Sequence, residues 1–83
     1  MTAGTKADRW QIRILRALDE RGGTTTGRVA GEVVGERSAA VSRGMRTELL
    51  WLERKGLVAA LDDLRPVAWV RTRLGTQVME GGE

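Results

Sequence analysis

The fold of this chain is decided by residues 49–58, which read LLWLERKGLV. This segment predicts the last turns of an amphipathic helix, followed by a glycine and then an apolar strand. Gly56 suits the left-handed residue that ends many helices, and Leu57 can fold back on Leu52, the apolar contact that accompanies this kind of helix end. Two basic residues just before the glycine lie where the negative end of the helix dipole favours them. We therefore expect a helix that stops at this glycine and leads directly into a β-strand.

Composition limits the classes of function. The chain has 83 residues, room for one small domain. It has no cysteine, histidine or tyrosine, so we expect no catalytic residues, no metal site and no cofactor, and hence no enzyme. No apolar run approaches the roughly 18 residues of a membrane span. We expect a cytoplasmic protein without a membrane partner, associated with the nucleoid when bound to DNA, and with no evident small-molecule ligand.

The charge balance gives a weak indication of nucleic acid. There are 14 basic and 11 acidic residues, a formal net charge of +3. Almost all the basic residues are Arg, which suits two-pronged contacts to phosphate and guanine. A GC-rich genome would explain the same excess of Arg equally well.

The first half of the chain predicts two helices. Apolar residues recur every fourth position within residues 7–21, which indicates a helix with Trp10, Ile14 and Leu18 on its buried side. A glycine pair ends this helix. One of three consecutive threonines then caps a second helix over about residues 27–34. Its inward-facing residues are Val29, Ala30 and Val33.

The third helix is the longest. It is expected to begin after Ser38, a favourable N-cap, and to end near Lys55. With about 100° per residue, its buried stripe consists of Val41, Met45, Leu49 and Leu52. The opposite side carries Arg43, Thr47, Leu50 and Arg54, with Arg46 on its flank.

Two apolar runs after this helix, residues 57–61 and 67–72, predict a β-hairpin with a loop between them. Residues 74–80 predict a short final helix. Residues 1–6 and 81–83 are expected to be flexible tails. The predicted class is therefore mainly α with a small β-hairpin (α+β), in the order helix, helix, helix, hairpin, short helix, within one domain over residues 1–83.

Three segments resemble winged helix-turn-helix repressors of the multiple-antibiotic-resistance (MarR), PadR and ArsR types. Residues 26–35 are similar to the supporting helix of these proteins, and residues 52–58 to the exit of their recognition helix. Residues 72–75, TRLG, resemble the Thr-x-x-Gly that follows the wing. Residues 35–52, which would form the turn and the recognition helix, are longer than in the family by about one helical turn. The long dimerisation helices of the family are absent.

The resemblance implies a sequence-specific protein for double-stranded DNA, a small transcriptional repressor acting as a homodimer. The third helix would enter the major groove. Its base-reading positions would be Ser42, Arg43, Arg46 and Thr47, with Ser38 near a phosphate. The alternative to DNA contact is that these residues only form a polar helix face exposed to solvent.

Phosphate contacts are expected from Arg28, at the start of the second helix, and from Arg65 in the hairpin loop. Asp62 and Asp63 beside Arg65 would repel phosphate, which is the main argument against binding through the wing.

Two other functions fit the sequence. A winged helix can act as a protein–protein adaptor or inhibitor, and its interface would include Trp10, Leu50 and Trp51. Leu50 could instead touch a thymine methyl group or be buried, and Trp51 is expected to pack on the strand that carries Trp69. An architectural or recombination directionality factor, which bends DNA, is the further alternative.

Overall fold

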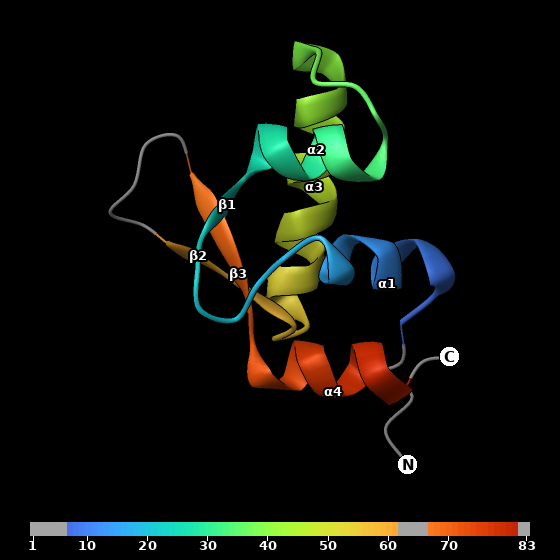
Figure 1. Ribbon diagram of the computed structural model, residues 1–83, viewed down its shortest axis with the longest axis vertical. Helices are drawn as coiled ribbons and strands as arrows, with labels where there is room; N and C mark the ends of the chain where they lie inside the picture. Colours follow the sequence, from blue (N-terminus) through green and yellow to red (C-terminus); the bar gives the residue numbers. More distant parts are fainter. Residues whose placement is uncertain (1–6, 62–66, 82–83) are drawn as a thin grey trace.

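The computed structural model describes residues 7–61 and 67–81. In this part, four helices and a three-stranded antiparallel sheet surround one core (Figure 1). The elements are α1 (Arg9–Arg16), β1 (Thr24–Thr25), α2 (Thr26–Val33), α3 (Ala39–Arg54), β2 (Val58–Leu61), β3 (Ala68–Arg71) and α4 (Arg73–Gly81). The predicted α+β class is confirmed. Gly81, expected in the C-terminal tail, is the last residue of α4.

The beginning of α1 is set by local hydrogen bonds. Asp8 is the N-cap: its Oδ1 accepts from the Gln11 backbone N–H at 2.8 Å, and its own N–H donates to Gln11 Oε1 at 3.2 Å. This reciprocal capping box satisfies two backbone donors that the first turn of a helix leaves without partners. Gln11 is consequently held in one orientation.

The end of α1 comes earlier than predicted, at Arg16 instead of residue 21. Arg71 of β3 explains the difference. Its Nη1 donates to the carbonyl oxygens of Leu15 and Leu18 at 2.8 and 2.7 Å. Its backbone N–H donates to the carbonyl oxygen of Asp19 at 2.9 Å. Because Arg71, more than 50 residues further along the chain, donates hydrogen bonds to these carbonyl groups, the helix ends here.

The connection from α2 to α3 is short. Thr25 caps α2, and its Oγ1 accepts from the Arg28 N–H at 3.3 Å. At the other end Gly35 adopts a φ of 86°, and the Arg13 guanidinium donates to the Val33 carbonyl at 2.8 Å. Ser38 then caps α3, as predicted. The two helices pack against one another across this turn (Figure 1).

The predicted end of α3 is confirmed. Gly56 has a φ of 78°, its N–H donates to the Glu53 carbonyl at 2.9 Å, and the Leu57 N–H donates to the Leu52 carbonyl at 3.0 Å. These two bonds are those of the Schellman motif, which needs a residue with positive φ and therefore favours glycine.

The Thr-x-x-Gly segment joins this helix end to α4. Thr72 Oγ1 donates to the Gly56 carbonyl at 2.7 Å and accepts from the Gly75 N–H at 3.0 Å. Gly75 lies so close to the preceding turn that a Cβ there would come within 3.1 Å of the Leu57 carbonyl carbon and 2.9 Å of Arg71 Cγ. Glycine is required at this position by close packing.

The hairpin was predicted, but the sheet has a third strand. β3 lies in the centre, with β2 on one side and β1 on the other. In β1, Thr24 pairs with Trp69 and Thr25 with Ala68. Trp69 is 1% exposed, and its indole N–H donates to Thr26 Oγ1 at 2.8 Å. The threonines that were expected to cap α2 therefore also close the sheet.

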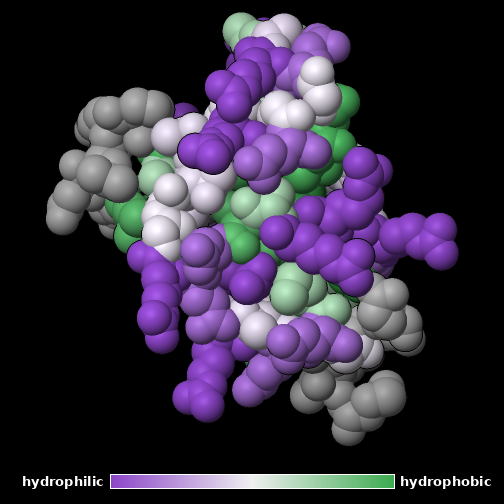
Figure 2. Space-filling view, viewed as in Figure 1, coloured by the Kyte–Doolittle hydropathy of each residue, from purple (hydrophilic) through white to green (hydrophobic). Residues whose placement is uncertain are grey.

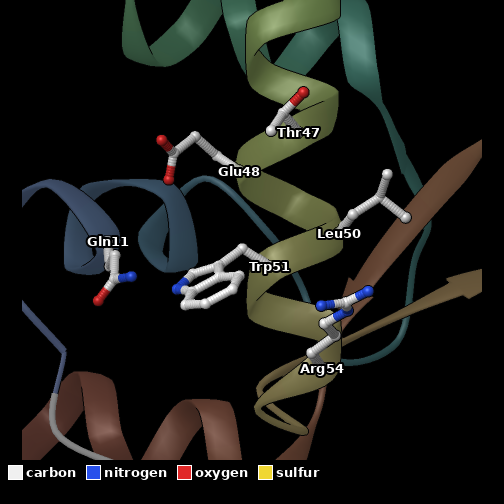
Figure 3. Close-up of a pocket in the computed structure, with 6 residues that line it drawn as sticks. All are labelled: Gln11, Thr47, Glu48, Leu50, Trp51 and Arg54. Atoms are coloured by element: carbon white, nitrogen blue, oxygen red, sulfur yellow. The ribbon is translucent and has the colours of Figure 1, made fainter.

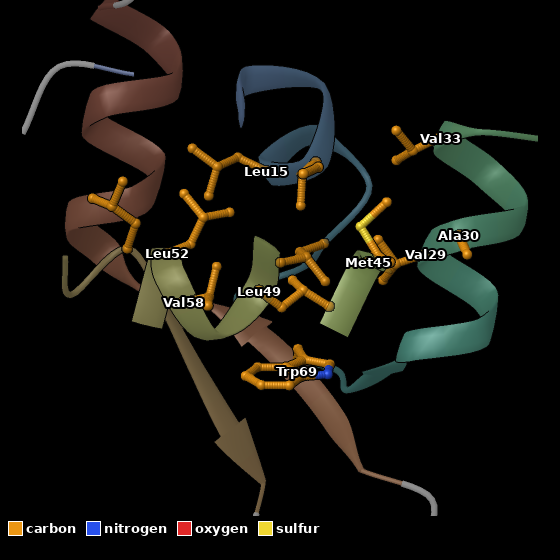
Figure 4. Packing of buried hydrophobic residues seen from close by; sticks show 12 residues of the cluster. Leu15, Val29, Ala30, Val33, Met45, Leu49, Leu52, Val58 and Trp69 are labelled. Atoms are coloured by element: carbon orange, nitrogen blue, oxygen red, sulfur yellow. The ribbon is translucent and has the colours of Figure 1, made fainter. Parts of the chain in front are cut away.

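The core lies between the sheet and helices α1, α2 and α3 (Figure 4). The predicted inward residues of α2 are buried, and so are Met45, Leu49 and Leu52 of α3, while Val41 is partly buried and packs against them. One prediction for the core is wrong: Trp10 is 36% exposed. The predicted burial of Ile14 and Leu18 is confirmed, and Gln11, Ile12 and Leu15 are buried with them. Trp10 borders a hollow that Gly44 of α3 also lines.

Candidate functional site

The most accessible surface of α3 is the side that faces away from the core. We call it the outer face of α3, and it consists of Arg43, Arg46, Thr47, Leu50 and Arg54, all exposed. Figure 3 shows α1 on one side of this helix and the hairpin on the other; Leu50 points toward the hairpin side and Glu48 toward α1. Leu50 is 44% exposed, so it faces away from the core as predicted, and the alternative that it is buried is wrong.

The charged groups of the outer face have few partners within the protein. No ion pair joins the guanidinium groups of Arg43, Arg46 or Arg54 to any residue that the structure describes. Thr47 Oγ1 donates to the Arg43 backbone carbonyl at 3.2 Å, so its lone pairs still point outward. Three solvated guanidinium groups along one side of a helix can bind phosphate or the acceptor edge of guanine.

The two serines predicted for this site lie elsewhere. Ser38 Oγ accepts from the Val41 N–H at 3.3 Å and donates to Glu36 Oε2 at 2.9 Å, so it is occupied in capping the helix. Ser42 is half-buried, and its Oγ lies 3.9 Å from where a Cβ on Gly27 of α2 would be. The structure thus brings Arg43, Arg46 and Thr47 together on the outer face and places Ser42 on the flank that faces α2.

Of the two arginines predicted to contact phosphate, one can be located. Arg28 lies in the first turn of α2, and its Nε is 3.4 Å from Glu32 Oε2, with both side chains exposed. A surface pair of this kind contributes about 0.3–0.5 kcal/mol, so a phosphate can displace the carboxylate at little cost. Arg65 falls within residues 62–66, outside the described part of the chain.

A groove runs along the flank of α3 that faces α1. We call it the α1–α3 groove; its volume is about 480 Å³, and it is lined by Gln11, Thr47, Glu48, Leu50, Trp51 and Arg54 (Figure 3). Trp51 is 52% exposed and points into the groove toward α1, with Lys55 Nζ 5.8 Å from the centre of its ring. The prediction that Trp51 packs on the strand of Trp69 is wrong, because Trp51 is directed toward α1 instead.

Large apolar side chains gather around this flank. Trp10, Val34, Leu50 and Trp51 are each at least 36% exposed. Trp10 and Val34 border a second hollow of about 260 Å³ on the same side of α3, which shares Glu48 with the first. By contrast, the view in Figure 2 shows mainly hydrophilic residues over α1 and α4, with hydrophobic ones in patches between them.

Other classes of site find no support in the described residues. Within residues 7–61 and 67–81, no three acidic side chains come together as a metal site, and no helix has the length and apolar character to cross a bilayer. Comparison with family models, curated proteins and solved structures found no match to this chain. Function must therefore be argued from the geometry and the motifs.

Sequence reasoning missed Gln11. It is the only polar side chain buried in the described residues, at 8% exposure. Its place three residues after Asp8 was the available signal, since Gln or Glu at this spacing forms a capping box.

Proposed function

We propose that this chain is a winged helix-turn-helix domain that binds double-stranded DNA, with α3 as the recognition helix and the β2–β3 hairpin as the wing. Two features support the fold: α2 and α3 pack together across a short turn that contains glycine, as in helix-turn-helix motifs, and the antiparallel hairpin follows α3 directly.

The observation that carries the proposal is the outer face of α3. A helix with its side chains is about 10–12 Å across, which matches the roughly 12 Å width of the major groove. Arg43 and Arg46 would each donate two hydrogen bonds to a guanine, worth about 1–3 kcal/mol of discrimination against another base. Arg28 would contact a phosphate on the side of α2. Binding would repress transcription by excluding RNA polymerase from the same DNA.

A single copy offers few contacts, so we propose a homodimer on a two-fold symmetric site. Helices α1 and α4, which pack on each other, would supply the interface. Two recognition helices would then read half-sites about 34 Å apart, one turn of DNA.

The test is fluorescence anisotropy of the pure protein with DNA from upstream of its own gene and with a random duplex, across a salt series. Tight, salt-dependent binding that prefers the upstream fragment supports the repressor. Equal binding to both duplexes supports the architectural alternative. No binding at about 50 mM salt, where phosphate contacts are strong, contradicts DNA binding altogether.

A second candidate is a protein-binding adaptor. The exposed Trp10, Val34 and Trp51 favour it, because tryptophan is enriched among the residues that dominate protein interfaces. In that case the protein would fail the DNA test, and Trp51→Ala would abolish capture of its partner.

A further inference from the structure

Two side chains that line the α1–α3 groove, those of Gln11 and Trp51, carry hydrogen-bond donors. The Gln11 side chain is more than nine-tenths buried, and its Oε1 is held by the Asp8 N–H. Its amide nitrogen is thereby directed into the groove, where Figure 3 shows it facing the indole nitrogen of Trp51. No described residue accepts a hydrogen bond from either nitrogen. Two N–H donors that line one groove and have no partner among the described residues can bind an acceptor there.

The surroundings favour an anionic acceptor. Arg54 lines the groove from the hairpin side of α3 (Figure 3), and Lys55 lies over the Trp51 ring at 5.8 Å, so two positive charges border the groove. Glu48 also lines the groove, and Figure 3 shows its carboxylate on the α1 side of α3, the side on which the two nitrogens lie. Around the groove as a whole, the two positive charges therefore outnumber the one negative charge.

The position of the groove identifies the anion. A helix that fills the major groove has a phosphate backbone along each flank, since the groove is about as wide as the helix. Trp51 comes one residue after Leu50 of the outer face and points sideways toward α1 (Figure 3). If α3 enters the major groove, the α1–α3 groove therefore lies where one sugar–phosphate strand passes. The apolar surfaces of Leu50 and Trp51 would cover a deoxyribose.

We infer that the α1–α3 groove holds a phosphodiester of the DNA backbone, with Gln11 and Trp51 as its neutral hydrogen-bond donors and Arg54 and Lys55 as its charged neighbours. This inference rests on the proposed function. It makes α1 part of the DNA interface and assigns the exposed Trp51 to nucleic acid instead of to a protein partner. Neutral donors to phosphate fix the register of a protein on DNA without reading its sequence.

Two substitutions test the donors while leaving the fold intact. Gln11→Glu keeps the carboxyl oxygen that accepts from the Asp8 N–H, as Glu does in a capping box, and replaces the amide donor with a negative oxygen. Trp51→Phe removes the indole N–H from an exposed position and keeps an aromatic ring. The chain offers two controls: Gly22→Glu adds the same negative charge at an exposed site between α1 and β1, where an added Cβ meets no atom within 4 Å, and Trp10→Phe makes the same ring change outside the groove.

Affinity is measured by fluorescence anisotropy on specific and random duplexes across a salt series, with thermal unfolding as the check on folding. Trp51→Phe should weaken binding to both duplexes about tenfold, since a hydrogen bond to a charged group is lost. Its salt slope should equal that of the wild type, because an indole neutralises no phosphate. Gln11→Glu should weaken both by at least as much. The controls should stay within about twofold of the wild type, a margin well below the loss expected of a charged hydrogen bond.

The outcomes separate the inference from the proposed function. If the wild type binds DNA and each variant matches its own control, the inference is wrong, the repressor proposal stands, and the groove becomes a surface for a protein. If the wild type binds no duplex, both are wrong. A loss confined to specific DNA would also overturn the inference, since a backbone contact must act on every sequence.

Discussion

Replacing Gly75 with alanine should destabilise the fold strongly, because a Cβ at this position has no room. It would lie 2.9 Å from Arg71 Cγ and 3.1 Å from the Leu57 carbonyl carbon, and it would also press on the Leu57 carbonyl oxygen. Two of these three atoms belong to the backbone, which cannot move aside as a side chain does. We expect α4 to shift away from the turn at Gly56 and Leu57.

The expected loss follows from three contributions. Overpacking costs about 1–3 kcal/mol. The shift would also stretch the bonds from the Thr72 hydroxyl to the Gly56 carbonyl (2.7 Å) and from the Thr72 N–H to the Leu57 carbonyl (3.1 Å), each worth about 0.5–1.5 kcal/mol. Alanine regains up to about 1 kcal/mol of helix propensity. The net loss is about 3 kcal/mol, or a Tm lower by roughly 10–20 °C in a domain of this size.

Thermal and urea unfolding, followed by circular dichroism, measure this effect. Gly44→Ala is the matched control, because Gly44 lies inside α3 with no atom within 4 Å of the added Cβ. That variant should be stabilised by about 0.5–1 kcal/mol. A Gly75→Ala protein with an unchanged or higher Tm would refute the argument from close packing, as would equal shifts for the two variants.

Three further outcomes are expected. Arg71→Lys, which keeps the charge but loses the planar fork, should cost about 2–4 kcal/mol in urea unfolding, because the carbonyls at the end of α1 lose a charged donor; a loss below about 1 kcal/mol would contradict this role. Gly56→Ala should cost about 1 kcal/mol, since Gly56 has a φ of 78°, and it fails as a prediction if stability rises. In the DNA assay, Arg43→Ala should remove most of the preference for specific DNA over random DNA. Arg28→Ala should weaken binding to all sequences and lower the salt slope by about one unit. If both variants lose equal affinity for both duplexes, this division of roles is wrong.

The parts of the fold that local signals specify were predictable. Ser38 and Gly56 delimit α3 because an N-cap and a left-handed C-terminal residue act within a few residues along the chain. The apolar stripe of α3 likewise follows from helical periodicity, and so does the set of outward residues that became the candidate site.

Long-range contacts decided what sequence reasoning missed. Strand β1 has only two residues and no periodicity; it exists because Trp69 and Ala68 pair with it. The early end of α1 depends on Arg71. The exposure of Trp10 and Trp51 depends on which neighbours cover them, and a pattern along one helix does not contain that information.

The hydrogen bond from Thr72 to the Gly56 carbonyl has a mechanical consequence. It joins Gly56, just after the end of α3, directly to Thr72, the residue before α4. A dimer assembled through α4 would therefore carry its two recognition helices as rigid attachments. Their separation would be set by how the α4 helices cross, so that a change in this crossing alone would alter which spacing of half-sites the protein accepts.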